Sequence, residues 1–286
     1  MFSEIAVIKS GGDLGSAVAH RLVQSGFSVI ITERAEPLSI RRKVSFSEAV
    51  YQQETVVEGV TARKASKEDP EGVLQLCSNG IIPVLVDEKL DILSKISVDI
   101  VIDATLRKKN VDMHRELAPI TIALGPGFTA PEDVDAVIET NRGHQLGRIY
   151  YWGNAMEDTG VPGVIDGFSR KRVIYSQQDG CFYGIKKIGD VVKKGDPIGE
   201  IHDPGKNHGS KIFVRAPIDG MIRGLIPEGC SVSKGMKIGD VDPRGKMAHY
   251  DLISDKGRTI SGGVLEAVLH LMNQKKPGGG KCIVKK

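Results

Sequence analysis

The chain contains an internal repeat with a period of 40 residues. The recurring positions are glycine, lysine, aspartate and aliphatic residues. They are Asp179, Gly180, Gly184, Gly189, Val192, Lys194, Gly195, Ile198 and Gly199, which recur as Asp219, Gly220, Gly224, Gly229, Val232, Lys234, Gly235, Ile238 and Gly239. Short alternating runs broken by glycines are typical of strands and tight turns. The repeat therefore predicts two copies of one β-rich unit that bury their apolar faces against each other.

The repeated segment, residues 173–241, resembles a biotinyl/lipoyl-like barrel-sandwich domain. The resemblance rests on Ala-Pro-Ile-Asp-Gly at 216–220 and on two Gly-x-x-Val-x-x-Gly phrases. In carriers of that family a modified lysine stands at a hairpin tip within an Ala-Met-Lys-Met-like motif, which would correspond to Lys206 or Lys211. Neither lysine has those flanking residues. We therefore expect a structural or docking module that carries no biotin or lipoate.

A second motif lies near the start of the chain. An apolar run at residues 4–8 is followed by a glycine-rich turn and an amphipathic helix pattern. Strand, turn and helix in this order open a dinucleotide-binding unit, in which backbone amides approach a pyrophosphate at the helix N-terminus. Ser10 replaces the first glycine of the usual Gly-x-Gly-x-x-Gly pattern. The alternative is a strand-to-helix connection without a ligand. The predicted cofactor-binding residues are Gly11, Gly12, Asp13, Leu14, Gly15 and Glu33.

Glu33 closes the next predicted strand, residues 27–32, and stands 18 residues after Gly15. An acidic residue at this place accepts hydrogen bonds from a ribose 2′-hydroxyl and repels a 2′-phosphate. The adjacent Arg34 favours the phosphate instead. We therefore expect NAD or NADP, with NAD preferred.

Buried-strand patterns continue at residues 81–87, 98–104 and 120–127. They suit the central parallel strands of a doubly wound sheet. The predicted fold is α/β, a Rossmann-like doubly wound parallel sheet with a biotinyl/lipoyl-like barrel-sandwich domain in the C-terminal half. The expected domains are 1–170 (Rossmann-like), 171–245 (barrel-sandwich) and 246–286 (C-terminal helix and flexible tail).

Polar side chains after these strands supply candidate catalytic residues. Ligands of doubly wound sheets bind outside the carboxyl ends of the strands, which singles out Asp103 and the lysine-rich loop 107–110 beside the glycine turn. A predicted strand at 134–140 leads to an arginine, which suits carboxylate or phosphate, and to a histidine, which can move protons. For the lysines, a solvated loop is the alternative. The candidates are Asp103, Lys108, Arg142 and His144, and no metal site is predicted.

Charge and cysteine usage limit the class of partner. The net charge is +3, from 39 basic and 36 acidic residues that are interspersed. This balance gives no general electrostatic case for nucleic acid or a membrane surface. The four cysteines have neither Cys-x-x-Cys nor metal-finger spacing. No apolar run approaches the length of a membrane span, and no signal-peptide pattern precedes the first strand, so we expect a cytoplasmic protein.

Several phrases together resemble the YqeB-type accessory proteins. They are Gly-Pro-Gly-Phe-Thr-Ala at 125–130, Thr-Gly-Val-Pro-Gly at 159–163, and the segments 137–148, 237–244 and 253–268. The resemblance covers nearly the whole chain, and the family is associated with the selenium-dependent molybdenum hydroxylase system. It implies a cytoplasmic maturation factor whose partner is an apo molybdenum hydroxylase similar to xanthine or purine dehydrogenase.

Two functions remain open at this point. In the first, a maturation factor binds a nucleotide or the molybdenum cofactor dinucleotide, and hands sulfur, selenium or cofactor to the apo-hydroxylase. Glu33 and the glycine turn would hold the nucleotide, while Arg142, His144 and Lys108 would face the group being handled. In the second, an NAD-dependent oxidoreductase acts on a small anionic substrate, with Asp103 or His144 as proton carrier. The resemblance favours the first, and whether any reaction is catalysed is left open.

The apolar spacing at residues 264–272 predicts a helix that packs on a domain face or on a second subunit, so a homo-oligomer is also open. Asp255 and Lys256 precede this run. We interpret them as a polar lock between the domains.

Overall fold

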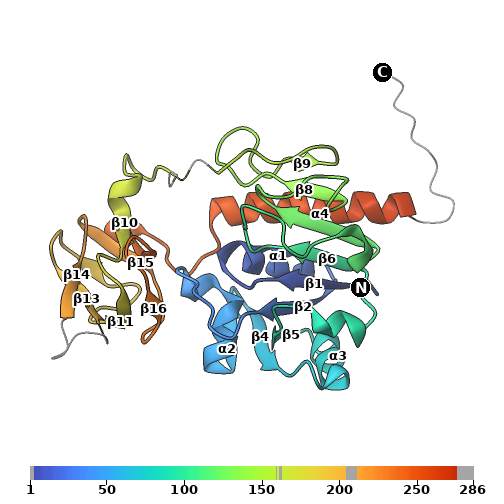
Figure 1. Cartoon of the computed structure of the whole chain (residues 1–286), viewed down its shortest axis with the longest axis horizontal. Helices are drawn as coiled ribbons and strands as arrows, with labels where there is room; N and C mark the ends of the chain where they lie inside the picture. The colour runs from blue at the N-terminus through green and yellow to red at the C-terminus, as the bar shows by residue number, and fades with distance from the viewer. Residues whose placement is uncertain (1–2, 159, 161–162, 204–210, 276–286) are drawn as a thin grey trace.

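The structure is a computed structural model that describes residues 3–158, 160, 163–203 and 211–275. Figure 1 shows a large sheet flanked by helices and, beside it, a smaller β-rich body. We call residues 173–242 the β-module. The chain runs from the large sheet into the β-module and then returns through a long helix to the large sheet. The two bodies are therefore joined twice.

Nine strands form the large sheet. They are β1 (Ile5–Lys9), β2 (Ser28–Glu33), β3 (Glu54–Val57), β4 (Val60–Ala65), β5 (Ile82–Val86), β6 (Ile100–Asp103), β7 (Ile120–Leu124), β8 (Ala136–Ile138) and β9 (Ile149–Tyr150). Their order across the sheet is β3-β4-β5-β2-β1-β6-β7-β8-β9. The strands from β4 to β8 in this order are parallel, whereas β3 and β9 pair antiparallel to their neighbours.

The described residues contain four α-helices and six 3-10 turns. The α-helices are α1 (Asp13–Gln24), α2 (Ala49–Gln52), α3 (Pro70–Ser78) and α4 (Asp255–Lys275). The 3-10 turns are η1 (Arg42–Val44), η2 (Phe46–Glu48), η3 (Asp91–Ser94), η4 (Arg115–Leu117), η5 (Arg170–Arg172) and η6 (Gly245–Met247). Figure 1 shows α1 and α4 on one face of the sheet and α3 on the other. One apolar core lies on each face.

The predicted Rossmann-like doubly wound parallel sheet is wrong, because the sheet is mixed and its second half lacks the expected crossover helices. At one edge, Glu58 and Gly59, both with positive φ, fold β4 back antiparallel on β3. The connections from β5 to β8 contain only 3-10 turns. The helix that covers this half is α4, which arrives from the far end of the chain. The apolar runs at 81–87, 98–104 and 120–127 contain the parallel strands β5, β6 and β7.

In the β-module, the strands of the two repeat copies form two sheets, and each sheet contains strands from both copies. Its strands are β10 (Val173–Tyr175), β11 (Gly180–Gly184), β12 (Val191–Val192), β13 (Pro197–His202), β14 (Lys211–Arg215), β15 (Gly220–Leu225), β16 (Ser231–Val232) and β17 (Lys237–Asp242). The two antiparallel sheets have the orders β10-β17-β15-β12 and β14-β13-β11-β16. Each sheet takes two strands from each copy, and both copies contribute to one apolar core. The prediction that the copies bury their apolar faces together is confirmed.

The recurring Asp-Gly pairs tie the two copies together. Asp179 Oδ1 accepts a hydrogen bond from the backbone N–H of Lys234, and Asp219 Oδ1 accepts one from Lys194, each at 2.8 Å. Gly220 follows Asp219 with φ 153°, and a Cβ there would lie 2.2 Å from the carbonyl oxygen of Asp242. Only glycine allows this approach of two strands. Each copy therefore caps a turn of the other.

The predicted biotinyl/lipoyl-like barrel-sandwich is also wrong, because the module consists of two separate four-stranded antiparallel sheets. Lys206, one of the two tip lysines, lies outside the described residues. Lys211 begins β14, and its ammonium pairs with the carboxylate of Glu200 at 2.8 Å. Lys211 is thus part of a strand rather than of a hairpin tip.

The helix α4 packs on the large sheet through small residues. A Cβ added at Gly263 would lie 2.2 Å from the carbonyl oxygen of Gly147, and one at Gly257 would lie 3.0 Å from the Cβ of Ala17. Ile260, Val264 and their neighbours enter the core that α1 shares with the sheet. The predicted packing of this helix on a domain face is confirmed.

Two adjacent glycines of α4 give a matched test of this contact. Gly262→Ala should raise the free energy of unfolding by about 1 kcal/mol, because alanine favours the helix and a Cβ there meets no atom within 4 Å. Gly263→Ala should lower the free energy of unfolding by about 2 kcal/mol through overpacking against Gly147. Urea denaturation of both variants measures the difference. Equal effects would mean that α4 does not pack through this face.

Candidate functional site

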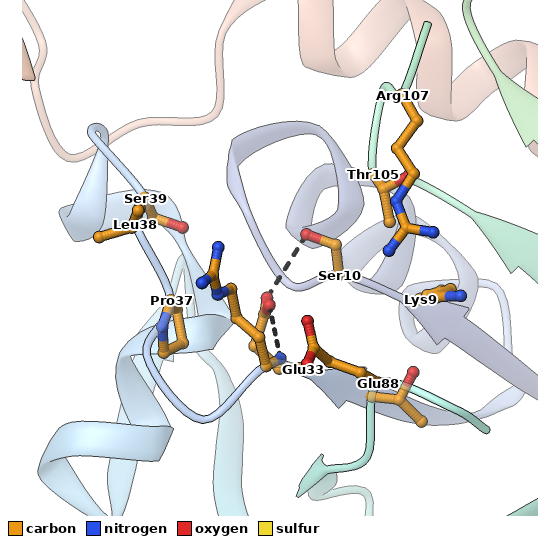
Figure 2. Close-up of a pocket in the computed structure, with 11 residues that line it drawn as sticks. Lys9, Ser10, Glu33, Pro37, Leu38, Ser39, Glu88, Thr105 and Arg107 are labelled. Atoms are coloured by element: carbon orange, nitrogen blue, oxygen red, sulfur yellow. Dashed lines mark hydrogen bonds between the residues drawn. The ribbon is translucent and has the colours of Figure 1, made fainter. Parts of the chain in front are cut away.

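Polar side chains line a crevice of about 330 Å³ at the carboxyl ends of β1, β2 and β6 (Figure 2). We call it the switch crevice, because the strand order reverses between β1 and β6. Open α/β sheets bind ligands at such positions. The lining residues are Lys9, Ser10, Thr32, Glu33, Arg34, Pro37, Leu38, Ser39, Glu88, Thr105 and Arg107.

The turn after β1 is strained at Ser10. Its φ is +81°, a left-handed value that favours glycine. The Ser10 N–H donates to the carbonyl of Thr32 at 2.8 Å, which fixes the turn beside β2. A Cβ added at Gly15 would lie 2.0 Å from the Ser10 carbonyl oxygen, so Gly15 permits the first turn of α1 to approach. Close packing therefore requires glycine at position 15, whereas a Cβ at Gly12 would meet no atom closer than 3.6 Å.

Glu33 holds the turn from the other side. One carboxylate oxygen accepts hydrogen bonds from the N–H of Gly11 at 2.9 Å and from the hydroxyl of Ser10 at 3.4 Å, and the other accepts from the N–H of Arg34 at 2.9 Å. Figure 2 shows the hydrogen bond between Ser10 and Glu33. Burial raises the pKa of Glu33, although these hydrogen bonds oppose the shift. Both oxygens of the Glu33 carboxylate therefore accept hydrogen bonds from the protein's own backbone.

The glycine turn itself does not open to the crevice. The N–H of Ser47 donates to the carbonyl of Gly11 at 2.9 Å, so the segment around η2 covers this glycine. Asp13 pairs with Arg41 at 3.1 Å and Leu14 is buried. Of the six predicted cofactor-binding residues, only Glu33 is among the side chains that line the switch crevice.

Two buried polar atoms near the strand ends lack a hydrogen-bond partner within the described residues. They are Oγ1 of Thr32, which lines the crevice, and Oδ2 of Asp103, at the end of β6. The other Asp103 oxygen accepts from the N–H and hydroxyl of Thr105, at 2.8 and 2.5 Å. Burial raises the pKa of Asp103. Buried polar atoms are rarely left unsatisfied, and they gather at functional sites.

The lining of the crevice contains three cationic side chains and two anionic ones. The ammonium of Lys9 and the guanidinium of Arg107 share one carboxylate, that of Asp112. Arg34 takes part in none of the ion pairs found among the described residues. Since Glu33 is engaged by backbone donors, the exposed Glu88 is the remaining acid of the lining. The guanidinium groups of Arg34 and Arg107 are the groups in this lining best suited to bind an anion.

The other predicted catalytic residues do not converge with Asp103. Lys108 is exposed, pairs with Asp158 at 2.9 Å and lines a separate cavity beside residues 126–129. Arg142 makes two hydrogen bonds to Asp255, at 2.6 and 3.0 Å. His144 is exposed on the loop after β8. Lys9 and Thr32 were missed by sequence reasoning, although both end strands that meet at the crevice.

No group of three or more His, Cys, Asp or Glu side chains within residues 3–158, 160, 163–203 and 211–275 is arranged to hold a metal ion. Over the same residues, no helix has the length and apolar character needed to cross a membrane.

The strain at Ser10 leads to a stability prediction. Ser10→Gly should raise the free energy of unfolding by roughly 0.5 kcal/mol, because the left-handed strain of about 1–2 kcal/mol exceeds the entropic penalty of glycine, about 0.5–1 kcal/mol. Ser25→Gly is the control, since Ser25 has φ −90° and no strain to relieve. Thermal unfolding should place the two variants on opposite sides of the wild type. A less stable Ser10→Gly would show that its hydroxyl contributes more than the backbone strain costs.

The Arg142–Asp255 ion pair predicts a pH dependence. Arg142 lowers the pKa of Asp255 from 3.8 to about 2, so the pair stabilises the fold above the unfolded pKa and the effect is lost as pH falls through the folded pKa. Because the pair is largely exposed, Asp255→Asn should cost less than about 1 kcal/mol at neutral pH. Urea unfolding from neutral pH down to about pH 2 should show the two proteins converging. Asp251→Asn removes an exposed carboxylate outside the described ion pairs and should show no convergence; a constant Asp255→Asn deficit would rule out the ion pair as its cause.

Comparison with solved structures finds hydrolase-family proteins at low similarity. One is a succinylglutamate desuccinylase from Silicibacter sp. TM1040, with 13% identity, coverage of 83% of this chain and 84% of that chain, and a TM-score of 0.27. Another is an aspartoacylase family protein from Mesorhizobium loti, with 13% identity, coverage of 84% and 85%, and a TM-score of 0.29. At these TM-scores the likeness supports no activity for this chain.

The predicted function is corrected. The prediction was a nucleotide-binding maturation factor, with an NAD-dependent oxidoreductase as the alternative. The glycine turn is covered by Ser47, and the residues meant to handle a transferred group lie apart. None of these findings shows a link to selenium or molybdenum hydroxylases. NAD, NADP, a molybdenum cofactor dinucleotide, an apo-hydroxylase partner and a homo-oligomer remain predictions.

No protein-family model matches the chain. The chain is 46% identical over 271 residues to the protein named Uncharacterized protein YqeB of Escherichia coli (strain K12). The match covers 95% of this chain and 48% of that protein, so the chain spans about half the length of its relative. The predicted family resemblance is confirmed, and the chain belongs to the YqeB-type proteins.

Proposed function

We propose that the chain binds a small organic molecule with an anionic group in the switch crevice. The observation that carries the proposal is the buried hydroxyl of Thr32, which has no partner among the described residues, in a lining that also holds the guanidinium of Arg34. A ligand would supply the hydrogen-bond partner of Thr32 and an anionic group for Arg34. Both groups come from the end of β2 or the residue after it.

The lining can orient such a molecule. A guanidinium binds carboxylate or phosphate through two parallel hydrogen bonds, which favours Arg34 and Arg107 as anchors for the anionic end. The carboxylate of Glu88 and the hydroxyls of Ser39 and Thr105 can pair with hydroxyl or amino groups at the other end. The volume of about 330 Å³ is at the lower end of small-molecule sites. These features suit a hydroxylated or aminated acid of metabolite size.

We place this binding in the cytoplasm as part of the proposal. The cysteines within the described residues, Cys77, Cys181 and Cys230, are free thiols. Thiols persist in reducing compartments. Cell fractionation with an antibody to the chain tests the location.

Thr32→Val separates a binding role from a structural one. Because the Thr32 hydroxyl has no partner within the described residues, its replacement by an isosteric methyl group should leave the free energy of unfolding unchanged or slightly higher. Ligand affinity should fall, since a charge-free hydrogen bond contributes about 1 kcal/mol. Arg34→Gln should weaken binding about tenfold or more, because hydrogen bonds to charged groups contribute about 1.5–3 kcal/mol.

The measurement is calorimetric titration at fixed ionic strength with hydroxy acids, amino acids and sugar phosphates, and with NAD as a further arm. Arg63→Gln is the matched control, because Arg63 is exposed on β4 and pairs with Glu54 away from the crevice. Saturable binding that Arg34→Gln weakens and Arg63→Gln leaves unchanged supports the proposal. Equal affinity in both variants, or no saturation with any compound, contradicts it.

A further inference from the structure

A second cavity, of about 230 Å³, lies where the large sheet, the β-module and the start of α4 meet. We call it the interdomain cavity. In Figure 1 the β-module stands beside the large sheet, and the chain that leaves the module enters α4 next to this junction. The basic side chains that line the cavity are Arg41, Arg142, Arg172, Arg223, Lys237 and Lys256.

These cations come from distant parts of the sequence. Arg41 precedes η1, Arg142 follows β8, and Lys256 is in the first turn of α4. Arg172 ends η5, Arg223 is in β15, and Lys237 begins β17. The cavity is therefore assembled only when the two bodies dock.

Carboxylates compensate only part of this charge. Asp13 pairs with Arg41 at 3.1 Å, and Asp255 pairs with Arg142 at 2.6 Å. The buried Asp240 is shared among Arg223, Arg172 and Lys237, at 2.6, 2.9 and 3.9 Å. Asp242 lies 4.0 Å from Arg223 but also pairs with Arg244 at 2.7 Å, so the six cations outnumber the carboxylates that pair with them.

Lys256 and Lys237 are the least compensated of the six. Lys256 is in none of the ion pairs among the described residues, and Lys237 approaches Asp240 only to 3.9 Å. Burial lowers the pKa of both lysines, and neighbouring arginines lower it further: Arg142 beside Lys256, and Arg172 and Arg223 beside Lys237. Carboxylates act in the opposite direction, chiefly Asp240 on Lys237 and Asp13 on Lys256. An anion between these groups would relieve both effects.

Two arginines also present unsatisfied donors. Arg41 and Arg172 are 7% and 6% exposed, and the Nε atom of each has no hydrogen-bond partner within the described residues. The terminal nitrogens are engaged, by Asp13 and the Leu252 carbonyl for Arg41 and by Asp240 and the Gly163 carbonyl for Arg172. Both side chains line the cavity. Their guanidinium groups are held in place with hydrogen-bonding capacity left over.

We propose that the interdomain cavity binds a small polyanion that carries phosphate or carboxylate groups. The excess of positive charge matches a ligand with more than one negative charge, and rigid arginine forks suit both kinds of oxyanion. A volume of about 230 Å³ suits a small anion rather than a polymer such as nucleic acid. The bound anion would link Arg41 and Lys256, which belong to the body that contains the large sheet, to Arg223 and Lys237 of the β-module. This site is separate from the switch crevice.

The test uses inorganic pyrophosphate and citrate as probes, with sulfate at the same ionic strength as the control for general screening. The full chain should bind at least one probe saturably, with an affinity tighter than about 1 mM, and its Tm should rise with probe concentration. Pyrophosphate alone would identify a phosphorylated ligand, and citrate alone a polycarboxylate. A sulfate effect of equal size, or no saturable binding of either probe, overturns the proposal.

Lys256→Gln distinguishes an anion site from a purely structural network. Since Lys256 forms no ion pair among the described residues, this variant should melt at or above the wild-type temperature without probe, and its affinity for the probe should fall at least about tenfold. Lys194→Gln, an exposed lysine on the β-module, should change neither quantity. A lower Tm with unchanged probe affinity in Lys256→Gln contradicts the proposal. Arg34→Gln should retain probe binding, so failure at the switch crevice and failure at this cavity are distinguishable.

Discussion

The architecture depends on the close packing of α4 against α1 and the loop after β8. Gly263 meets Gly147 at a distance that leaves no room for a Cβ, and Gly257 lies in tight contact with Ala17. This contact returns the chain to the large sheet after the β-module, so the module is joined to the sheet body at both of its ends. It also buries the apolar face that the second half of the sheet would otherwise expose, because the connections from β5 to β8 contain no α-helix.

The same contact assembles the polar junction between the two bodies. The N-terminal turn of α4 brings Asp255 to Arg142 and Lys256 into the interdomain cavity. The interpretation of Asp255 and Lys256 as a lock between domains is therefore altered. Asp255 binds a loop of the sheet body, whereas Lys256 faces a cavity that the β-module completes.

The glycine turn shows how tertiary context changes the meaning of a motif. Its sequence is that of a strand, a turn and a helix, and the structure contains all three. However, Glu33 occupies the turn N–H and Ser47 covers Gly11, so the motif supports packing of β1, α1 and β2. The proposed site at this edge of the sheet instead includes Thr32 and Lys9, which no local pattern marks. The net charge of +3 likewise gave no sign of a cavity lined by six cations.

The sequence by itself determined the elements with local signals. The 40-residue repeat, the apolar runs of β5, β6 and β7, and the helix at 264–272 were all readable, because strand and helix periodicity depends on neighbouring residues. Only the tertiary structure decided that the sheet is mixed, that the two copies exchange strands, and that α4 replaces the missing crossover helices. It also brought Arg41 to Arg223 and placed Lys108 and His144 away from Asp103. Such contacts join residues far apart in the chain, and their energies depend on burial and shape complementarity, which no single stretch of sequence contains.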